Sequence, residues 1–125
     1  MAYIPAGVLT AGIAVISLWE APQLPPPVMS LGDKALHGAM YLVLAVFWMI
    51  PVVRQFSSRL VPYICVWAAV TIYGGVLELL QHFCTRTRSG EVADLYADAI
   101  GAVVGVGLVA LGYWIITRKN GQSAL

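Results

Sequence analysis

The sequence predicts an all-α, polytopic membrane protein: a single domain over residues 1–125, built as a bundle of four transmembrane helices. Of the 125 residues, 60% are hydrophobic and 10% are charged, with a mean hydropathy of +0.83. Soluble domains carry roughly 25% charged residues, and a soluble fold of this size has too little interior to hide so much apolar surface. The sequence also lacks the polar–apolar alternation of membrane β-barrel strands.

Four apolar segments are candidates for crossing a bilayer, which takes about 20 apolar residues per helix. They cover residues 3–18, 35–53, 60–80 and 92–116. The first segment is short, but no Lys or Arg precedes it and no clear small-x-small cleavage site follows it. We therefore interpret it as a helix of the bundle and not as a cleaved signal peptide.

The basic residues indicate how the bundle is oriented. Four helices place both termini on one side, together with the connection between the second and third helices. That side carries Arg54, Arg59, Arg118 and Lys119, and the opposite side carries Lys34, Arg86 and Arg88. Because Lys and Arg are enriched in cytoplasmic loops, we expect both termini in the cytoplasm.

The acidic residues gather on the opposite, outer side of the predicted bundle. All six lie there: Glu20, Asp33, Glu78, Glu91, Asp94 and Asp98. Three pairs four residues apart each share one helix face: His37 with Tyr41, Glu78 with His82, and Asp94 with Asp98. We therefore expect most of the titratable side chains to converge in one outward-facing polar pocket.

Small residues continue these polar faces into the membrane. Gly74 or Gly75, with Thr71, follows the face of Glu78, and Gly101 and Gly105 follow that of Asp98. Small residues allow membrane helices to approach closely. We therefore expect the polar faces of the second, third and fourth helices to point at each other.

Depth within each helix separates structural from functional interpretations of the acids. Asp33 fits the N-cap of the second helix, and Glu91 and Asp94 fit the first turn of the fourth, where the helix dipole favours acids. Glu78 and Asp98 lie a turn or more inside their helices, where an ionised group facing lipid costs about 2.5–3.5 kcal/mol. They need partners, which either an internal salt-bridge network or a ligand site would supply.

Three functions remain open for this pocket: binding an anion, binding a metal ion, and catalysis. Lys34, Arg86 and Arg88 beside two helix N-termini suit a phosphate or carboxylate, although the nearby acids neutralise much of that charge. A metal is the second alternative, with donors from His37, Glu78, His82, Asp94 and Asp98. Their spacing matches no recognised zinc motif, so we predict no metal and no other cofactor.

The third alternative is catalysis, in which Glu78, Asp94 and His37 would do acid–base chemistry on a lipid-linked substrate. The sequence contains no nucleophile elbow, HExxH motif or phosphate-binding loop. We therefore favour a binding protein over an enzyme, with a structural accessory protein as a further alternative.

Three motifs in order resemble the VanZ-like family of small bacterial membrane proteins. They are "DKALHGAMYLVLA", "YGGVLELLQHF" and "RSGEVADLYADAIGAVVG", and together they cover about residues 33–105. The positions that match the family pattern are Asp33, Lys34, His37, Gly74 or Gly75, Glu78, Gln81, Arg88, Asp94, and Asp98 with Gly101. This chain departs from it at Asp98, where the family usually has Asn, and His82 is not part of the pattern.

The resemblance implies a multi-pass protein of the bacterial inner membrane, linked to teicoplanin (lipoglycopeptide) resistance or to cell-envelope assembly. Its expected partners are the lipid bilayer and an envelope lipid, glycolipid or glycopeptide-type headgroup, and no nucleic acid. The oligomeric state and the identity of the ligand stay open. The predicted ligand-binding residues are Asp33, Lys34, His37, Tyr41, Glu78, Gln81, Arg88, Asp94 and Asp98.

Overall fold

The protein is a bundle of four helices in a computed structural model. The model describes residues 1–19, 26–56, 60–85 and 91–122, with backbone only for 26–31 and 121–122. The helices are α1 (Ile4–Leu18), α2 (Pro26–Phe56), α3 (Leu60–Cys84) and α4 (Val92–Gln122), and no strand occurs among the described residues. The predicted all-α class with four helices is confirmed.

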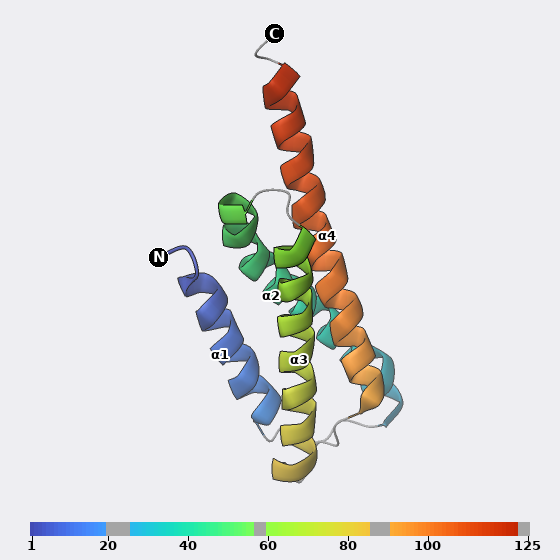
Figure 1. The fold of residues 1–125 in the computed structure, drawn as a ribbon. Helices are drawn as coiled ribbons and strands as arrows, with labels where there is room; N and C mark the ends of the chain where they lie inside the picture. Colours follow the sequence, from blue (N-terminus) through green and yellow to red (C-terminus); the bar gives the residue numbers. More distant parts are fainter. Residues whose placement is uncertain (20–25, 57–59, 86–90, 123–125) are drawn as a thin grey trace.

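The four helices run alternately up and down, so both termini lie at the end where α2 passes into α3 (Figure 1). At the other end α1 finishes, α2 begins, α3 finishes and α4 begins. This arrangement agrees with the predicted grouping of the termini. Which end faces the cytoplasm stays a prediction.

Three of the helices are long and apolar enough to cross a membrane: α2 from Gly32, α3 over its full length, and α4 as far as Asn120. The first helix is apolar but has 15 residues. At about 1.5 Å per residue it falls short of a hydrocarbon core of about 30 Å. The helices expose large apolar side chains such as Leu60, Ile72 and Leu79, which suits surfaces in contact with lipid.

The second helix begins earlier than the sequence predicted. It starts at Pro26 and not near residue 35, so Asp33 lies inside the helix and the predicted N-cap role is wrong. Proline has no backbone N–H, but in the first turn of a helix that N–H would have no partner within the helix, so proline is tolerated there. Pro26 and Pro27 are therefore compatible with the first turn of α2. The fourth helix also extends past residue 116, to Gln122.

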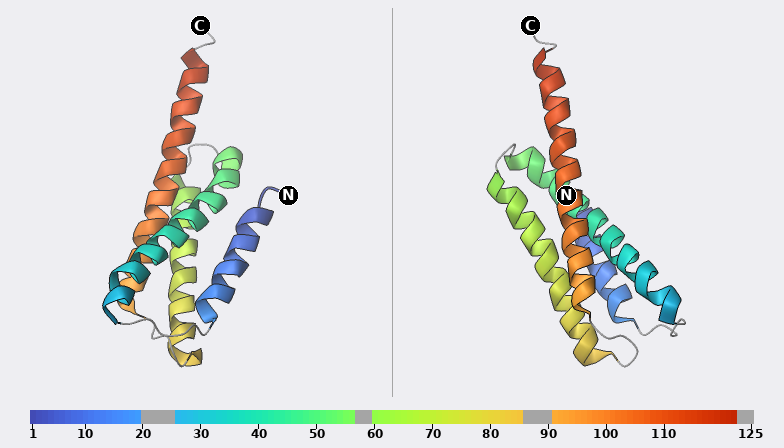
Figure 2. Two further views of the ribbon diagram at one scale, coloured as in Figure 1. Left: turned by 180° about the vertical axis from the view of Figure 1, so that it is seen from behind. Right: turned by 90° about the vertical axis from the view of Figure 1, so that its right-hand side faces the viewer.

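The most extensive helix–helix contact joins α2 and α4, which cross obliquely (Figure 2). Glycines permit this approach, because a Cβ on Gly101 would overlap the backbone of Gly38 and one on Gly105 would overlap the carbonyl oxygen of Leu42. The predicted small-residue face of the fourth helix therefore does pack against a neighbouring helix. It brings the first half of α4 close enough for Asp94 and Asp98 to reach α2.

Hydrogen bonds hold α1 against α2 and α3. The Tyr73 hydroxyl donates to the backbone carbonyl of Thr10, and the Trp48 indole N–H donates to the Thr10 hydroxyl at 3.1 Å. At the other end of α1, the Gln81 side-chain amide donates to the carbonyl oxygen of Ser17 at 2.8 Å. Two of these bonds end on backbone carbonyl groups of α1 and one on the Thr10 hydroxyl, and the bond to Ser17 gives Gln81 a structural role.

Candidate functional site

Seven polar side chains from α2, α3 and the start of α4 gather at the end of the bundle where α4 begins. This polar cluster consists of Asp33, Lys34, His37, Glu78, Glu91, Asp94 and Asp98. Of these, His37, Glu78, Asp94 and Asp98 are buried. The structure therefore brings together residues that lie up to 65 positions apart in the sequence, from Asp33 to Asp98.

His37 is at the centre of the cluster. Its Nδ1 lies 3.0 Å from Oδ1 of Asp98 and 3.7 Å from Oε1 of Glu78. Asp98 is completely buried, and its second oxygen, Oδ2, has no hydrogen-bond partner among the described residues. A buried carboxylate oxygen without a hydrogen-bond partner lowers the stability of the fold. A bound proton, cation or ligand at this oxygen would remove that cost.

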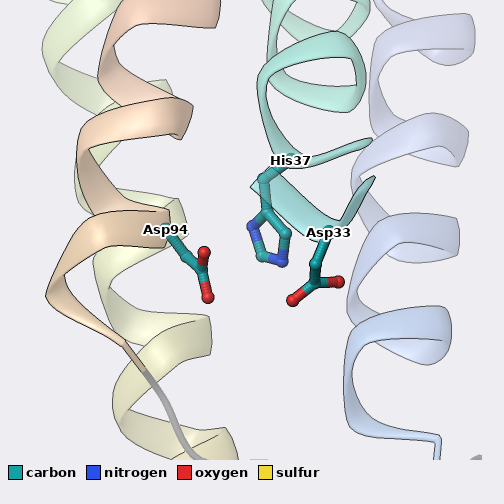
Figure 3. A group of neighbouring side chains, drawn as sticks. All are labelled: Asp33, His37 and Asp94. Atoms are coloured by element: carbon teal, nitrogen blue, oxygen red, sulfur yellow. The ribbon is translucent and has the colours of Figure 1, made fainter. Parts of the chain in front are cut away.

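On the other side of His37, two more carboxylates face the imidazole ring. Figure 3 shows Asp33, from α2 itself, and Asp94, from α4, directed toward the same space as the ring. One ligand atom from each of these three side chains lies within 4.8 Å of the others. The imidazole is therefore surrounded by carboxylates from three helices.

Lys34 and Glu91 form the more exposed edge of the cluster. The Lys34 ammonium lies 3.1 Å from Oε2 of Glu91 and 3.5 Å from Oδ1 of Asp94. The contact with Asp94 is an ion pair without hydrogen-bond geometry, since that oxygen has no hydrogen-bond partner. The backbone N–H of Glu91 donates to Oε2 of Glu78 at 3.0 Å. Glu91 thus links α3 to the start of α4.

Tyr41 and Gly74 close the inner side of the cluster. The Tyr41 ring is buried and stacks on His37, with ring centroids 6.4 Å apart and an interplanar angle of 7°. A Cβ on Gly74 would lie 2.5 Å from Oδ2 of Asp98 and 2.9 Å from Cε1 of Tyr41. A larger residue at this position would displace the Asp98 carboxylate and the Tyr41 ring, so Gly74 rather than Gly75 continues the polar face of α3.

Charge in the cluster is unbalanced. Among the described residues, five carboxylates surround one ammonium and one imidazole. Even with the imidazole protonated, negative charge is in excess. Low-dielectric surroundings strengthen the repulsion between buried like charges, so the cluster favours a bound cation, a bound proton or a ligand with hydrogen-bond donors.

A second feature lies nearer the opposite end, between α1, α2 and α3. It is an apolar cavity of about 500 Å³ whose lining includes Thr10, Trp48, Val66, Ala69 and Tyr73. Tyr73 also packs near Tyr41, with ring centroids 6.4 Å apart. The cavity and the polar cluster are therefore separated by little more than these two rings.

The comparison with protein families identifies the chain. A family model described as VanZ/LLP1 matches residues 4–115. The chain belongs to the VanZ/LLP1 family. The match covers α1, α2 and α3 completely and most of α4. It is longer than the range of about 33–105 that carries the motifs. Searches of curated proteins and of solved structures found no match to this chain.

The cluster of this VanZ/LLP1 protein contains most of the predicted site residues. Asp33, Lys34, His37, Glu78, Asp94 and Asp98 come together, and Tyr41 stacks on them. Gln81 is buried but directs its amide to Ser17. His82 is exposed beside Phe83 and takes no part in the cluster. The predicted contributions of Arg86 and Arg88 fall outside the described residues.

Two features of the VanZ/LLP1 chain were missed at the level of sequence. Glu91 was interpreted mainly as a first-turn acid, yet it bonds both Lys34 and Glu78. The apolar cavity was not predicted either. Trp48 and Thr10 carried a signal for it, since a polar group inside an apolar helix needs a partner from a neighbouring helix.

Proposed function

We propose that this VanZ/LLP1 protein binds the polar headgroup of an envelope lipid or a glycopeptide-type ligand at the polar cluster, and that this binding underlies teicoplanin resistance or envelope assembly. One observation carries the proposal. A largely apolar bundle buries four ionisable side chains from three helices at one end, and ionisable residues at membrane depth are usually functional.

The chemistry of the cluster favours donors on the ligand. Lys34 already pairs with Glu91 and lies close to Asp94, whereas oxygens of Glu78, Asp94 and Asp98 have unused acceptor capacity. Sugar hydroxyl and amine groups would satisfy such acceptors. The proposal therefore places hydroxyl or amine groups of the headgroup at the carboxylates, with any phosphate at Lys34.

The apolar cavity supports a ligand that also carries an acyl chain. Its volume of about 500 Å³ and its position beside Tyr73 offer space for hydrocarbon close to the cluster. A lipid-linked ligand would then use both features. A glycopeptide without an acyl chain would use the cluster alone and bind more weakly.

The test compares teicoplanin binding by wild-type protein and Glu78→Gln in lipid nanodiscs. We expect at least a tenfold loss of affinity in Glu78→Gln and near-wild-type affinity in the control His82→Gln, because His82 lies on the same helix but is exposed and outside the cluster. A glycopeptide lacking the acyl chain should bind more weakly than teicoplanin. Susceptibility of a sensitive host to teicoplanin should follow the same order. Equal binding by wild type and Glu78→Gln contradicts the proposal.

The hydrogen-bonded His37–Asp98 pair beside Glu78 favours one alternative, acid–base catalysis on a lipid-linked substrate with Glu78, Asp94 and His37. Mass spectrometry of the lipid ligand after incubation separates the two functions. A binder returns the ligand unchanged, and an enzyme returns a product that Glu78→Gln does not form. A purely structural network predicts lower thermal stability in Glu78→Gln with unchanged ligand affinity of the folded fraction.

A further inference from the structure

We propose that His37, Glu78 and Asp98 form a binding site for a divalent transition-metal ion, with Zn²⁺ as the preferred ion. The three side chains come from α2, α3 and α4, and each is buried. One ligand atom of each lies within 4.8 Å of the others. Imidazole and carboxylate are both ordinary zinc ligands, and residues on three helices hold them in place.

The spacing of the donor atoms suits a tetrahedral ion. Zinc–ligand bonds of about 2.0–2.2 Å place neighbouring ligand atoms about 3.4 Å apart in a tetrahedron. The distances from Nδ1 of His37 are 3.0 Å to Asp98 Oδ1 and 3.7 Å to Glu78 Oε1, on either side of that value. The two distances from His37 are therefore within a few tenths of an ångström of tetrahedral spacing, and the Glu78 and Asp98 ligand atoms lie within 4.8 Å of each other. Three protein ligands leave a fourth position for water or another ligand.

Unbalanced buried charge is a second, independent observation. Glu78 and Asp98 are two carboxylates beside one imidazole, and Oδ2 of fully buried Asp98 has no hydrogen-bond partner among the described residues. Buried charges in proteins are paired or coordinate a metal. One divalent cation cancels two carboxylates and leaves the imidazole neutral, which is the form that binds metal.

The surroundings of His37 supply the expected outer shell. A metal-ligating histidine commonly donates its second ring N–H to a carboxylate, which fixes the orientation of the ring. Asp33 and Asp94 face the imidazole in Figure 3. Oε2 of Glu78, the oxygen not assigned to the metal, accepts the backbone N–H of Glu91 at 3.0 Å. Glu78 is therefore oriented by a backbone group, and His37 has carboxylates near the side of its ring that faces away from Asp98.

The zinc site shares Glu78 and Asp98 with the proposed headgroup site, but metal content is measured without any lipid ligand, so the two proposals can fail separately. The full chain is purified in detergent without a polyhistidine tag, stripped with a chelator and titrated with Zn²⁺ against a chromophoric competitor. We expect one Zn²⁺ per chain, release of protons on binding, and a higher thermal midpoint with metal. With Co²⁺ in place of Zn²⁺, we expect the visible absorption of a tetrahedral site.

Variants then assign the ligands. His37→Gln, Glu78→Gln and Asp98→Asn should each weaken Zn²⁺ binding by more than the roughly 10–100-fold that outer-shell changes cost. His82→Gln is the matched control, since His82 lies one turn beyond Glu78 on α3 and is exposed. Its affinity and stoichiometry should equal those of the wild type. Circular dichroism and gel filtration show which variants retain the fold.

Two results would overturn the inference. One is wild-type protein that binds no Zn²⁺ above the level of protein-free micelles, and this measurement needs no variant to fold. The other is a folded His37→Gln or Asp98→Asn variant that keeps wild-type affinity while His82→Gln loses it, which would place the metal on the surface. Tighter binding of Mg²⁺ than of Zn²⁺ would overturn the choice of ion.

Discussion

At one end of the bundle, side chains of α2, α3 and α4 fill the space between the helices, whereas nearer the other end residues of α1, α2 and α3 line a partly open apolar cavity of about 500 Å³. The filled end depends on glycines. Gly74, Gly101 and Gly105 lie where a larger residue would overlap the polar cluster or the backbone of α2. The cavity end depends on a few hydrogen bonds between helices, such as that from Tyr73 to Thr10.

The two ends of this small membrane bundle therefore differ in packing: one end buries polar side chains, and the other leaves space for apolar groups. Close approach of α2 and α4 desolvates the polar cluster, which strengthens the interactions among its charged groups. Looser packing of α1 leaves space beside Tyr73 and Trp48 that apolar groups can occupy. Added volume should therefore be costly at the first end and tolerated at the second.

Gly101→Ala should have the largest effect. A Cβ at this position overlaps the backbone of Gly38, which cannot move aside without separating α2 from α4. Overpacking costs typically 1–3 kcal/mol, and we expect the upper end, about 3 kcal/mol of unfolding free energy. Reversible unfolding in mixed micelles, followed by circular dichroism, measures it. Gly107→Ala and Gly112→Ala on the same helix meet no atom within 4 Å and should behave as wild type.

Gly74→Ala should have the next largest effect, about 2 kcal/mol. Its Cβ would push against the Asp98 carboxylate and the Tyr41 ring, which are side chains and can shift a little. The same unfolding assay applies, with Gly75→Ala as the control because its Cβ would make an ordinary contact with Leu95 at 3.5 Å. Equal loss in the two variants would mean that α3 is rotated from the register described here.

Tyr73→Phe tests the cavity end and should cost about 1 kcal/mol, the usual net contribution of one hydrogen bond. The change removes the hydroxyl that donates to the Thr10 carbonyl and leaves the ring in place. Tyr96→Phe is the control, since Tyr96 is 68% exposed on α4. If Tyr73→Phe is as stable as Tyr96→Phe, the bond does not hold α1 in place.

Ala69→Val should have the smallest effect, within about 0.5 kcal/mol of wild type. Ala69 lies on α3 as Gly74 does, but it lines the apolar cavity, so two added methyl groups enter open space. The variant is measured beside Gly74→Ala under identical conditions. A loss in Ala69→Val as large as that in Gly74→Ala would show that the cavity is filled, and the contrast between the two ends would disappear.

The sequence by itself determined the class of the protein and the approximate position of its four helices, though not where the second begins or the fourth ends. Long apolar runs interrupted by polar connections specify membrane helices. The free energy of placing a segment in lipid depends on the amino-acid composition of that segment more than on the helices that pack beside it. Spacing also placed Asp94 with Asp98, and Gly101 with Gly105, on common faces of one helix. Those pairings follow from helix geometry and need no tertiary information.

Only the tertiary structure decided which members of each face reach the polar cluster. Glu78 and His82 share a face by spacing, yet Glu78 is buried and His82 is exposed, because α3 ends beyond the region that α2 and α4 cover. The partnership of Lys34 with Glu91, and the use of Gln81 on Ser17, likewise join helices far apart in sequence. Helix periodicity determines which side chains share one side of a helix. The way in which neighbouring helices cross determines which side of that helix is buried, and over what length.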